Sequence, residues 1–526
     1  MSAMRKTFFV FIVVVAAVDL AAPPGFSQAR RSYENSLVLV PLYVDYTSKS
    51  EAQFATDAAE LKQRLGAAPY VMLGFSGFIS IAYPAVPLDK SITDDDMAAT
   101  LNQADTIVNR ARNNGIVAHV SLVSGFFHGS NDLQRAAVQA DVRNAQWFSD
   151  GWIAPPEQLK DPETIPPGVW ITPSRYAQPL RTRIEEATRI LGRHLAGLMA
   201  RNPDTFVTVS GDGEVELSYE RSYDEGATKV STTAPLIYAD YSPFAIEEFR
   251  DWIRAGRYEG DLSPASDDNF DGHTLNGDFR QSFSTWNLRY FDNSPPIPYS
   301  EYLRLPEKLP SSGPYFIPGG FDAPRKEANE DPFWNAWIEF RKGLVKNWVH
   351  DFAGWITTTP DPATGFQIPY SRFYSHQIPA DLIFGESDNP RIRTSASYIE
   401  TAVLEPFGGT GVTAFNGWDG RGHKKTATPE LYSQLFLTSD NWGIMEYNPS
   451  LSYSNDVPSS DDLPYYMNEL RMLWQFRPHI IIPFAWSDLP THRKFSIQGT
   501  TFEQALNRFV RDVGQGPWFS WRAVLR

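Results

Sequence analysis

Short apolar runs rich in β-branched residues recur along the chain beyond residue 35, and segments with helical periodicity separate them. This alternation is typical of repeated units in which a helix connects two parallel strands. The predicted strands cover residues 36–46, 70–78, 115–129, 205–217, 371–379, 408–420, 442–450 and 478–488.

Between several of these runs, apolar residues recur every three or four positions, which places them on one face of a helix. The four predicted stripes are Met97, Leu101, Ala104 and Val108; Ile184, Ala187, Leu191, Leu195 and Leu198; Phe333, Trp337, Phe340, Leu344, Trp348 and Phe352; and Phe502, Leu506, Phe509 and Val513. We interpret each stripe as the face of a helix that covers the sheet.

Eight strands with covering helices predict a (β/α)8 TIM barrel, and a doubly wound open sheet is the alternative. One barrel domain over residues 30–526 is compatible with the length, because barrels with insertions reach this size. The stretch from about 218 to 330 is rich in Pro, Gly, Asp and Ser. It predicts a long insertion after strand four, packed over the barrel mouth.

The first 29 residues have the layout of a secretory signal peptide. Arg5 and Lys6 precede an apolar run over 8–18, and Ser27 and Ala29 form a small-x-small cleavage pattern. Because the run is short for a membrane span, we expect cleavage, with a retained anchor as the alternative. The mature protein is then expected to be secreted or periplasmic, without membrane contact.

Composition narrows the ligand class. The net charge of -15 and the lack of a basic cluster disfavour nucleic acid. Aromatic residues make up 14% of the chain, and their flat apolar faces suit the faces of sugar rings, although a large aromatic core is an equal explanation. With no cysteine, disulfides and thiol chemistry are excluded.

Carboxylates stand at the ends of two predicted strands, where barrel enzymes carry their reacting groups. Strand four ends in Asp212-Gly213-Glu214-Val215-Glu216, and Glu446 lies near the end of strand seven. Two carboxylates facing each other across one barrel mouth are what glycoside hydrolysis requires, one as proton donor and one as nucleophile or base.

Several segments resemble clan A glycoside hydrolases, in particular the β-galactosidase-like family 42 group. These are "DGE" at 212–214, "WGIMEYNPS" at 442–450, "YADYSPFAIEEFRDWIR" at 238–254, "FYSHQIP" at 373–379, and Trp486 at the end of strand eight. The resemblance implies that Glu214 is the acid/base and Glu446 the nucleophile of a retaining, cofactor-independent hydrolase. Enzymes of this clan are often oligomers, so a homo-oligomer is compatible with it.

Two features leave the assignment open. Gly213 stands where the family pattern has Asn, whose side chain contacts the sugar 2-hydroxyl. Glu216 points to the same face of a strand as Glu214, because side chains alternate with a period of two. We prefer Glu214 as acid/base, with Glu216 as a neighbour that raises the pKa of the proton donor.

Further candidates for substrate contact are polar or aromatic residues near the predicted strand ends or in the loop after strand three. They are Asp45, His128, Trp170, Arg175, His376, Gln377, Asn416, Trp418, Trp442, Tyr447 and Trp486. For Asp45 a surface or capping role is an equal alternative, and for Arg175 an ion pair at a helix start is preferred. The nine histidines show no spacing typical of a metal site.

The sequence therefore predicts a secreted retaining glycoside hydrolase that cleaves β-glycosidic bonds in oligo- or polysaccharides. An inverting enzyme similar to β-amylase is the second enzymatic option, and a non-catalytic carbohydrate-binding barrel is the third. The sugar, the linkage and the endo or exo action stay open at this point.

Overall fold

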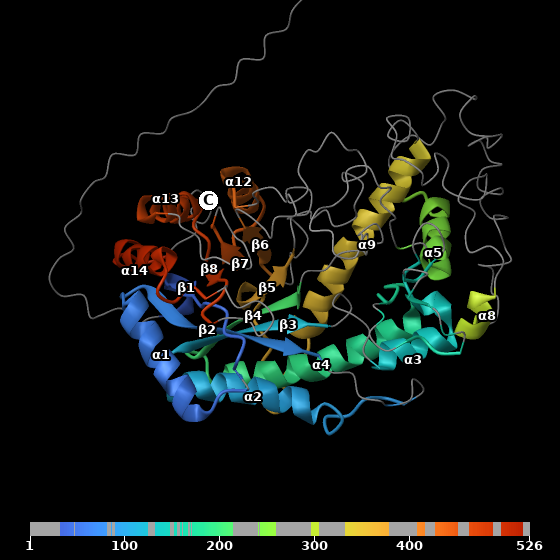
Figure 1. Ribbon diagram of the computed structural model, residues 1–526, viewed down its shortest axis with the longest axis horizontal. Coiled ribbons are helices and arrows are strands. Elements are labelled where there is room, and N and C mark those ends of the chain that lie inside the picture. Colours follow the sequence, from blue (N-terminus) through green and yellow to red (C-terminus); the bar gives the residue numbers. More distant parts are fainter. Residues whose placement is uncertain are drawn as a thin grey trace, which may run out of the picture.

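The computed structural model describes residues 32–46, 48–81, 86, 90–124, 132–147, 152–154, 158–159, 161, 163–166, 169, 171–213, 240, 242–258, 296–304, 332–377, 408–415, 427–450, 462–487 and 496–518. Eight parallel strands form one sheet in the order β5-β4-β3-β2-β1-β8-β7-β6 (Figure 1). The strands are β1 (Leu37–Leu39), β2 (Val71–Ser80), β3 (Val117–Val123), β4 (Phe206–Gly213), β5 (Phe373–His376), β6 (Thr410–Phe415), β7 (Trp442–Asn448) and β8 (Ile480–Pro483).

The sheet closes into a barrel where β5 meets β6. Isolated bridges join Tyr374 to Gly409 and Gln377 to Val412, and the Ser375 amide donates a 3.0 Å hydrogen bond to the Gly409 carbonyl. Closure confirms the predicted (β/α)8 barrel and rules out the open doubly wound sheet. Each of the eight predicted strands contains one observed strand or overlaps nearly all of it.

Helices form an outer layer around the strands, as Figure 1 shows. The helices of this layer are α1 (Glu51–Leu65), α2 (Ala98–Asn113), α4 (Gln178–Arg201), α9 (Pro332–Thr357), α12 (Pro429–Thr438), α13 (Leu463–Trp474) and α14 (Thr501–Val513). Three more helices lie beyond the strands: α3 (Asp132–Ala140), α5 (Pro243–Arg254) and α8 (Tyr299–Leu303). The four predicted apolar stripes fall on α2, α4, α9 and α14. Among the described helices, none is long and apolar enough to cross a membrane.

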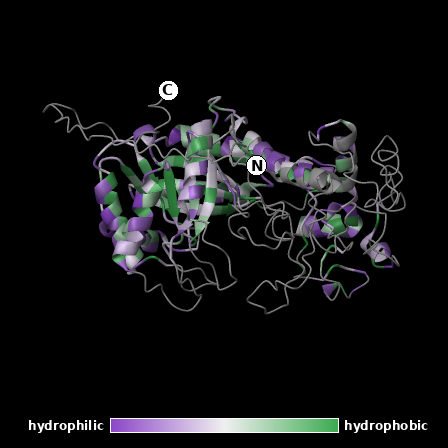
Figure 2. Cartoon of the chain, turned by 90° about the horizontal axis from the view of Figure 1, so that it is seen from above, coloured by the Kyte–Doolittle hydropathy of each residue, from purple (hydrophilic) through white to green (hydrophobic). Residues whose placement is uncertain are grey.

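Apolar side chains fill two layers, one inside the barrel and one between strands and helices. The inner layer includes Val38, Val117, Val207, Met445 and Ile482, all at most 6% exposed. The outer layer is much larger and takes the buried faces of the helices. In Figure 2 the strands are correspondingly rich in hydrophobic residues. This packing fixes the strand ends from which the mouth is built.

Both ends of the described chain lie at the side of the barrel where the strands begin. The Trp518 amide donates a 2.8 Å hydrogen bond to the Asn35 carbonyl, and the Trp518 ring stacks on His479 at 3.9 Å between centroids. His479 directly precedes β8 and forms a polar cluster with Tyr33 and Tyr374. The floor of the barrel is therefore closed by side chains from both ends.

Most of the predicted insertion at about 218–330 lies outside the described residues. Its described parts include α5 and α8, which contact the short helix Val142–Asn144 and α3 respectively, and α5 also contacts α9. The predicted signal peptide at 1–29 also lies outside the described residues.

Candidate active site at the barrel mouth

The carboxyl ends of β4 to β7 bring Gly213, His376, Thr413 and Glu446 together. Gly213 pairs with His376 in the register of β4 and β5. His376 Nε2 lies 3.1 Å from Thr413 Oγ1 and 3.9 Å from Glu446 Oε1. Glu446 is 8% exposed and His376 2%, so both groups are largely withdrawn from bulk water. A carboxylate beside an imidazole in this position defines a candidate active site.

An irregularity in the sheet turns Glu446 toward the barrel interior. The register of β6 against β7 shifts between Val412 and Thr413, so that Thr413 lies opposite Glu446. Met445 belongs to the inner apolar layer and Tyr447 to the outer one. Strict alternation would point Glu446 outward, and an extra residue of the bulge kind lets Met445 and Glu446 both face inward.

Asp212 is fully buried at the end of β4 and connects three elements. Its Oδ1 accepts the Ser124 amide at 2.7 Å, and its Oδ2 accepts the Ser124 hydroxyl and the Trp348 indole N–H, the latter at 3.0 Å. Burial raises the pKa of Asp212, and the hydrogen bonds from Ser124 and Trp348 pull it partly back. Asp212 thereby fixes the end of β4 against β3 and α9.

Gly213 fits a confined position. A Cβ atom there would lie 3.0 Å from Val123 Cγ2 and 3.6 Å from the Leu122 carbonyl oxygen. The first distance is tighter than ordinary van der Waals contact, so the Val123 side chain would have to move by a few tenths of an ångström to admit a larger residue. Glycine at this position avoids that contact.

Below the mouth, a polar column continues into the barrel. His119 contacts Thr208 Oγ1 at 2.8 Å through Nδ1 and Ser210 Oγ at 3.0 Å through Nε2. Burial, with a smaller contribution from His376, lowers the pKa of His119 to about 3, so the ring is neutral at ordinary pH. The neutral imidazole of His119 therefore adds no charge below the mouth.

Several predicted site residues lie outside the described residues. They are Glu214, Glu216, His128, Trp170, Asn416 and Trp418. Glu214 directly follows Gly213, whose partner His376 also lies beside Glu446. The pairing of Glu214 with Glu446, and the choice between Glu214 and Glu216, stay predictions.

Three predicted aromatic contacts need correction. Trp442 begins β7, at the end away from the mouth, and its indole donates to the Phe476 carbonyl at 3.0 Å. Tyr447 is fully buried in the outer layer, 6.0 Å from the Phe502 ring centroid. Trp486 is also fully buried and packs against Phe75. All three face the helical layer and have no access to a substrate at the mouth.

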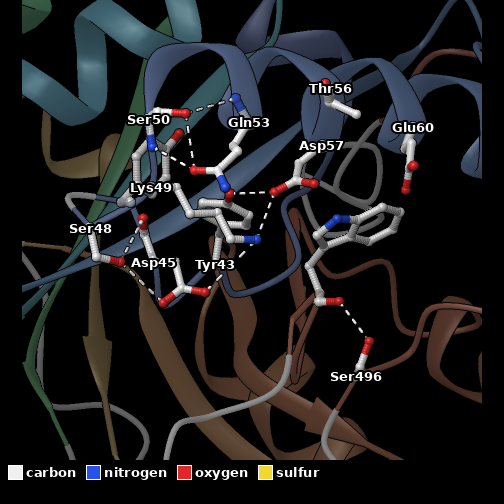
Figure 3. A network of polar contacts seen from close by, with 12 residues as sticks. Tyr43, Asp45, Ser48, Lys49, Ser50, Gln53, Thr56, Asp57, Glu60 and Ser496 are labelled. Atoms are coloured by element: carbon white, nitrogen blue, oxygen red, sulfur yellow. Dashed lines mark hydrogen bonds and ion pairs between the residues drawn. The ribbon is translucent and has the colours of Figure 1, made fainter.

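The other candidates are held by protein contacts. Gln377 donates from its amide to Ser375 Oγ at 2.6 Å and belongs to the seam between β5 and β6. Asp45 lies in a turn after β1, where Figure 3 shows it in a polar network with Ser48 and Lys49. This position favours the surface alternative for Asp45.

Arg175 is 2% exposed and lies shortly before α4. Its guanidinium carbon is 5.7 Å from the Trp348 ring centroid, and its charge lowers the pKa of Asp212 as a minor contribution. Arg175 thus acts electrostatically on a carboxylate of the protein, Asp212.

Sequence reasoning assigned no role to Thr413, Ser124 or His119, predicted only a helix-face position for Trp348, and treated Asp212 as part of an acidic cluster and of the "DGE" segment. A signal existed for Asp212, because a carboxylate inside an otherwise uncharged buried strand requires donors. None existed for Thr413 and Ser124, whose contacts depend on strands far apart in the sequence.

Fold and site together define a (β/α)8 barrel with a carboxylate and an imidazole at its mouth. No protein-family model matches the sequence, and no curated protein resembles it at the sequence level. Among solved structures, the fold is similar to the catalytic domain of β-amylase from Paenibacillus polymyxa, with a TM-score of 0.53 and 10% identity over 91% of this chain and 99% of that chain. At this identity the match establishes the fold alone.

Two further structures match with lower scores. A β-galactosidase from Bacillus circulans sp. alkalophilus has a TM-score of 0.48 and 9% identity, over 92% of this chain and 57% of that chain. An apo exo-carrageenase GH42 from Bacteroides ovatus has a TM-score of 0.48 and 11% identity, over 91% of this chain and 52% of that chain.

Proposed function

We propose that the protein is a glycoside hydrolase that retains anomeric configuration and cleaves β-glycosidic bonds in oligo- or polysaccharides. The observation that carries the proposal is the position of Glu446, inside the mouth at the end of β7 and 3.9 Å from His376. His376 pairs with Gly213, the residue before Glu214, so strand register supports the approach of the two glutamates.

In the proposed reaction, the Glu214 carboxylic acid gives its proton to the glycosidic oxygen while Glu446 attacks the anomeric carbon. The bond to the leaving sugar breaks and a glycosyl ester with Glu446 forms. Glu214, now a carboxylate, takes a proton from water, and the resulting nucleophile displaces Glu446. Thr413 and His376 lie next to the nucleophile, and the burial of Glu446 limits the contact of its carboxylate with water.

Substitution of both carboxylates tests the assignment. Glu446→Gln is expected to lower kcat on aryl β-glycosides by at least about 10⁴-fold, because the nucleophile is lost. Glu214→Gln should lose most activity on substrates with poor leaving groups but keep turnover of dinitrophenyl glycosides, whose departure needs no proton. Glu469→Gln is the matched control, since Glu469 is 7% exposed on α13, away from the mouth.

Circular dichroism must show that each variant is folded. Wild-type turnover by folded Glu446→Gln would exclude Glu446 as nucleophile. If Glu216→Gln, and not Glu214→Gln, loses activity on poor leaving groups but keeps turnover of dinitrophenyl glycosides, then Glu216 is the acid/base. Binding of oligosaccharides by the wild type without hydrolysis of any glycoside would support the non-catalytic barrel.

The alternative is an inverting enzyme similar to β-amylase, a protein whose catalytic domain has a fold similar to that of this chain, with a TM-score of 0.53. Inversion requires carboxyl groups about 6.5–9.5 Å apart, whereas retention requires about 5–5.5 Å. Proton NMR of the first product anomer distinguishes the two mechanisms, because a retaining enzyme releases the anomer that it cleaved.

A further inference from the structure

A cavity lies outside the barrel proper, between the start of α4, the middle of α9 and α5. Its volume is about 460 Å³. In Figure 1, α4 and α9 extend beyond the strands on the side toward which β2 and β3 point, and α5 lies at the far end of α9. The cavity is therefore on the mouth side of the molecule, distinct from the Glu446 site.

Aromatic rings form one wall of this cavity. The Tyr176 and Phe340 rings stack with centroids 5.6 Å apart at an interplanar angle of 10°, and Trp252 lies 5.8 Å from Phe340. Tyr176 and Trp252 are half-buried, so parts of their rings remain open to a ligand. Flat apolar surfaces with polar edges fit the C–H faces of sugar rings.

Most of the rest of the lining consists of planar polar groups, which are neutral amides, carboxylates and guanidinium groups. Gln178, Asn347, Glu248 and Arg257 are exposed, and Arg181 forms an ion pair with Asp351. Amide, carboxylate and guanidinium groups can each bond two adjacent hydroxyls. The mixed charge favours a neutral ligand over an anionic one, and the polar lining disfavours an aliphatic one.

The cavity shares a wall with the end of β4. Trp348 lines the cavity and also donates its indole N–H to Asp212 at 3.0 Å. Arg175, another lining residue, lies over the Trp348 ring. Because Asp212 precedes Gly213 at the mouth, a chain of several sugar units could extend from the mouth toward this cavity.

We propose that this cavity is a non-catalytic binding site for a neutral oligosaccharide, where it holds a distant unit of the chain that is cleaved at the mouth. That the bound chain is the one cleaved at the mouth rests on the proposed hydrolase function. That the cavity binds a neutral oligosaccharide does not. The two claims are therefore tested with separate measurements.

Gly343 offers a way to fill the cavity. It lies in α9 and lines the cavity, and no described atom would come within 4 Å of a Cβ added there. Gly343→Trp is thus expected to occupy the cavity without displacing the helix. Gly354→Trp is the matched control, because Gly354 is in the same helix, also has no described atom within 4 Å of an added Cβ, and is not among the residues that line the cavity.

Calorimetry with the full-length Glu446→Gln protein measures binding without turnover. The probes are cellohexaose, mannohexaose, galactohexaose and maltohexaose. For the best-bound hexasaccharide, Gly343→Trp and Trp252→Ala should each weaken binding at least about tenfold. Gly354→Trp and Tyr370→Ala, which removes a 65% exposed aromatic residue outside the cavity, should leave the affinity unchanged.

Equal affinities in folded Gly343→Trp and the parent, or no binding of any hexasaccharide to the parent, overturn the proposal. If the site binds but the protein hydrolyses nothing, the cavity assignment stands and the hydrolase proposal fails. If both hold, Gly343→Trp in the wild-type background should lower the ratio of kcat/KM for the hexasaccharide to that for the aryl monoglycoside. An unchanged ratio removes the link between cavity and mouth.

Discussion

Asp212 shows how a single buried carboxylate can organise a strand end. Its two oxygens accept three donors from Ser124 and Trp348, and the nearest residues in sequence carry the candidate chemistry. A carboxylate without these donors would be costly in this position. The residue therefore links the stability of β4 to the geometry of the mouth.

Asp212→Asn is expected to reduce the free energy of unfolding by about 1–3 kcal/mol, because the new NH2 group faces a donor of Ser124 or Trp348. The effect should depend on pH. The folded pKa of Asp212 is raised by burial, so between the unfolded and folded pKa values the folded state binds more protons, and wild-type stability falls as pH rises. The asparagine variant lacks this slope.

Urea unfolding between about pH 4 and 8 measures both effects, with Asp204→Asn, an exposed carboxylate in the turn before β4, as the control. The advantage of the wild type over Asp212→Asn should shrink toward high pH. An advantage that grows with pH would mean that the folded pKa of Asp212 is lowered.

At the scale of elements, the seam between β5 and β6 depends on close backbone approach. A Cβ on Gly411 would lie 2.1 Å from the Ser375 carbonyl oxygen and 2.6 Å from Met445 Cγ. The seam consists of isolated bridges and a few hydrogen bonds, so losing one of them removes a large share of the pairing between β5 and β6.

Gly411→Ala should therefore destabilise the barrel by about 1–3 kcal/mol or more, through overpacking against backbone. Gly354→Ala in α9 is the control, and it should be neutral or stabilising by up to about 1 kcal/mol because glycine is a poor helix former. Thermal and urea unfolding of both variants measure the difference. Equal stability of the two variants would show that the seam can open at no cost.

The strands and the main helical stripes were predictable because buried apolar runs and helical periodicity are local properties. The direction of individual side chains was not, because a register shift at Thr413 sets which of Met445, Glu446 and Tyr447 faces inward. Trp442 is different. It stands at the start of its own predicted strand, so the rule that reacting groups gather at carboxyl ends was sufficient to exclude it.

At the scale of the whole molecule, the exported form stays a prediction. Residues 1–29 have the layout of a signal peptide, and we propose that the mature chain begins near Arg30. Expression in a bacterium with an intact secretion pathway should yield periplasmic or secreted protein with Arg30 at its N-terminus, by intact mass or Edman sequencing. A chain that keeps Met1 and sediments with membranes would instead support a retained anchor.

The contact between Trp518 and Asn35 has a practical consequence for handling the protein. A purification handle or a fused partner joined next to Asn35 or Trp518 starts from the floor, on the opposite side from the proposed chemistry, and should not obstruct incoming sugar chains. The same proximity should permit a rearranged polypeptide, in which a short linker connects these two positions and new termini open in a surface loop elsewhere.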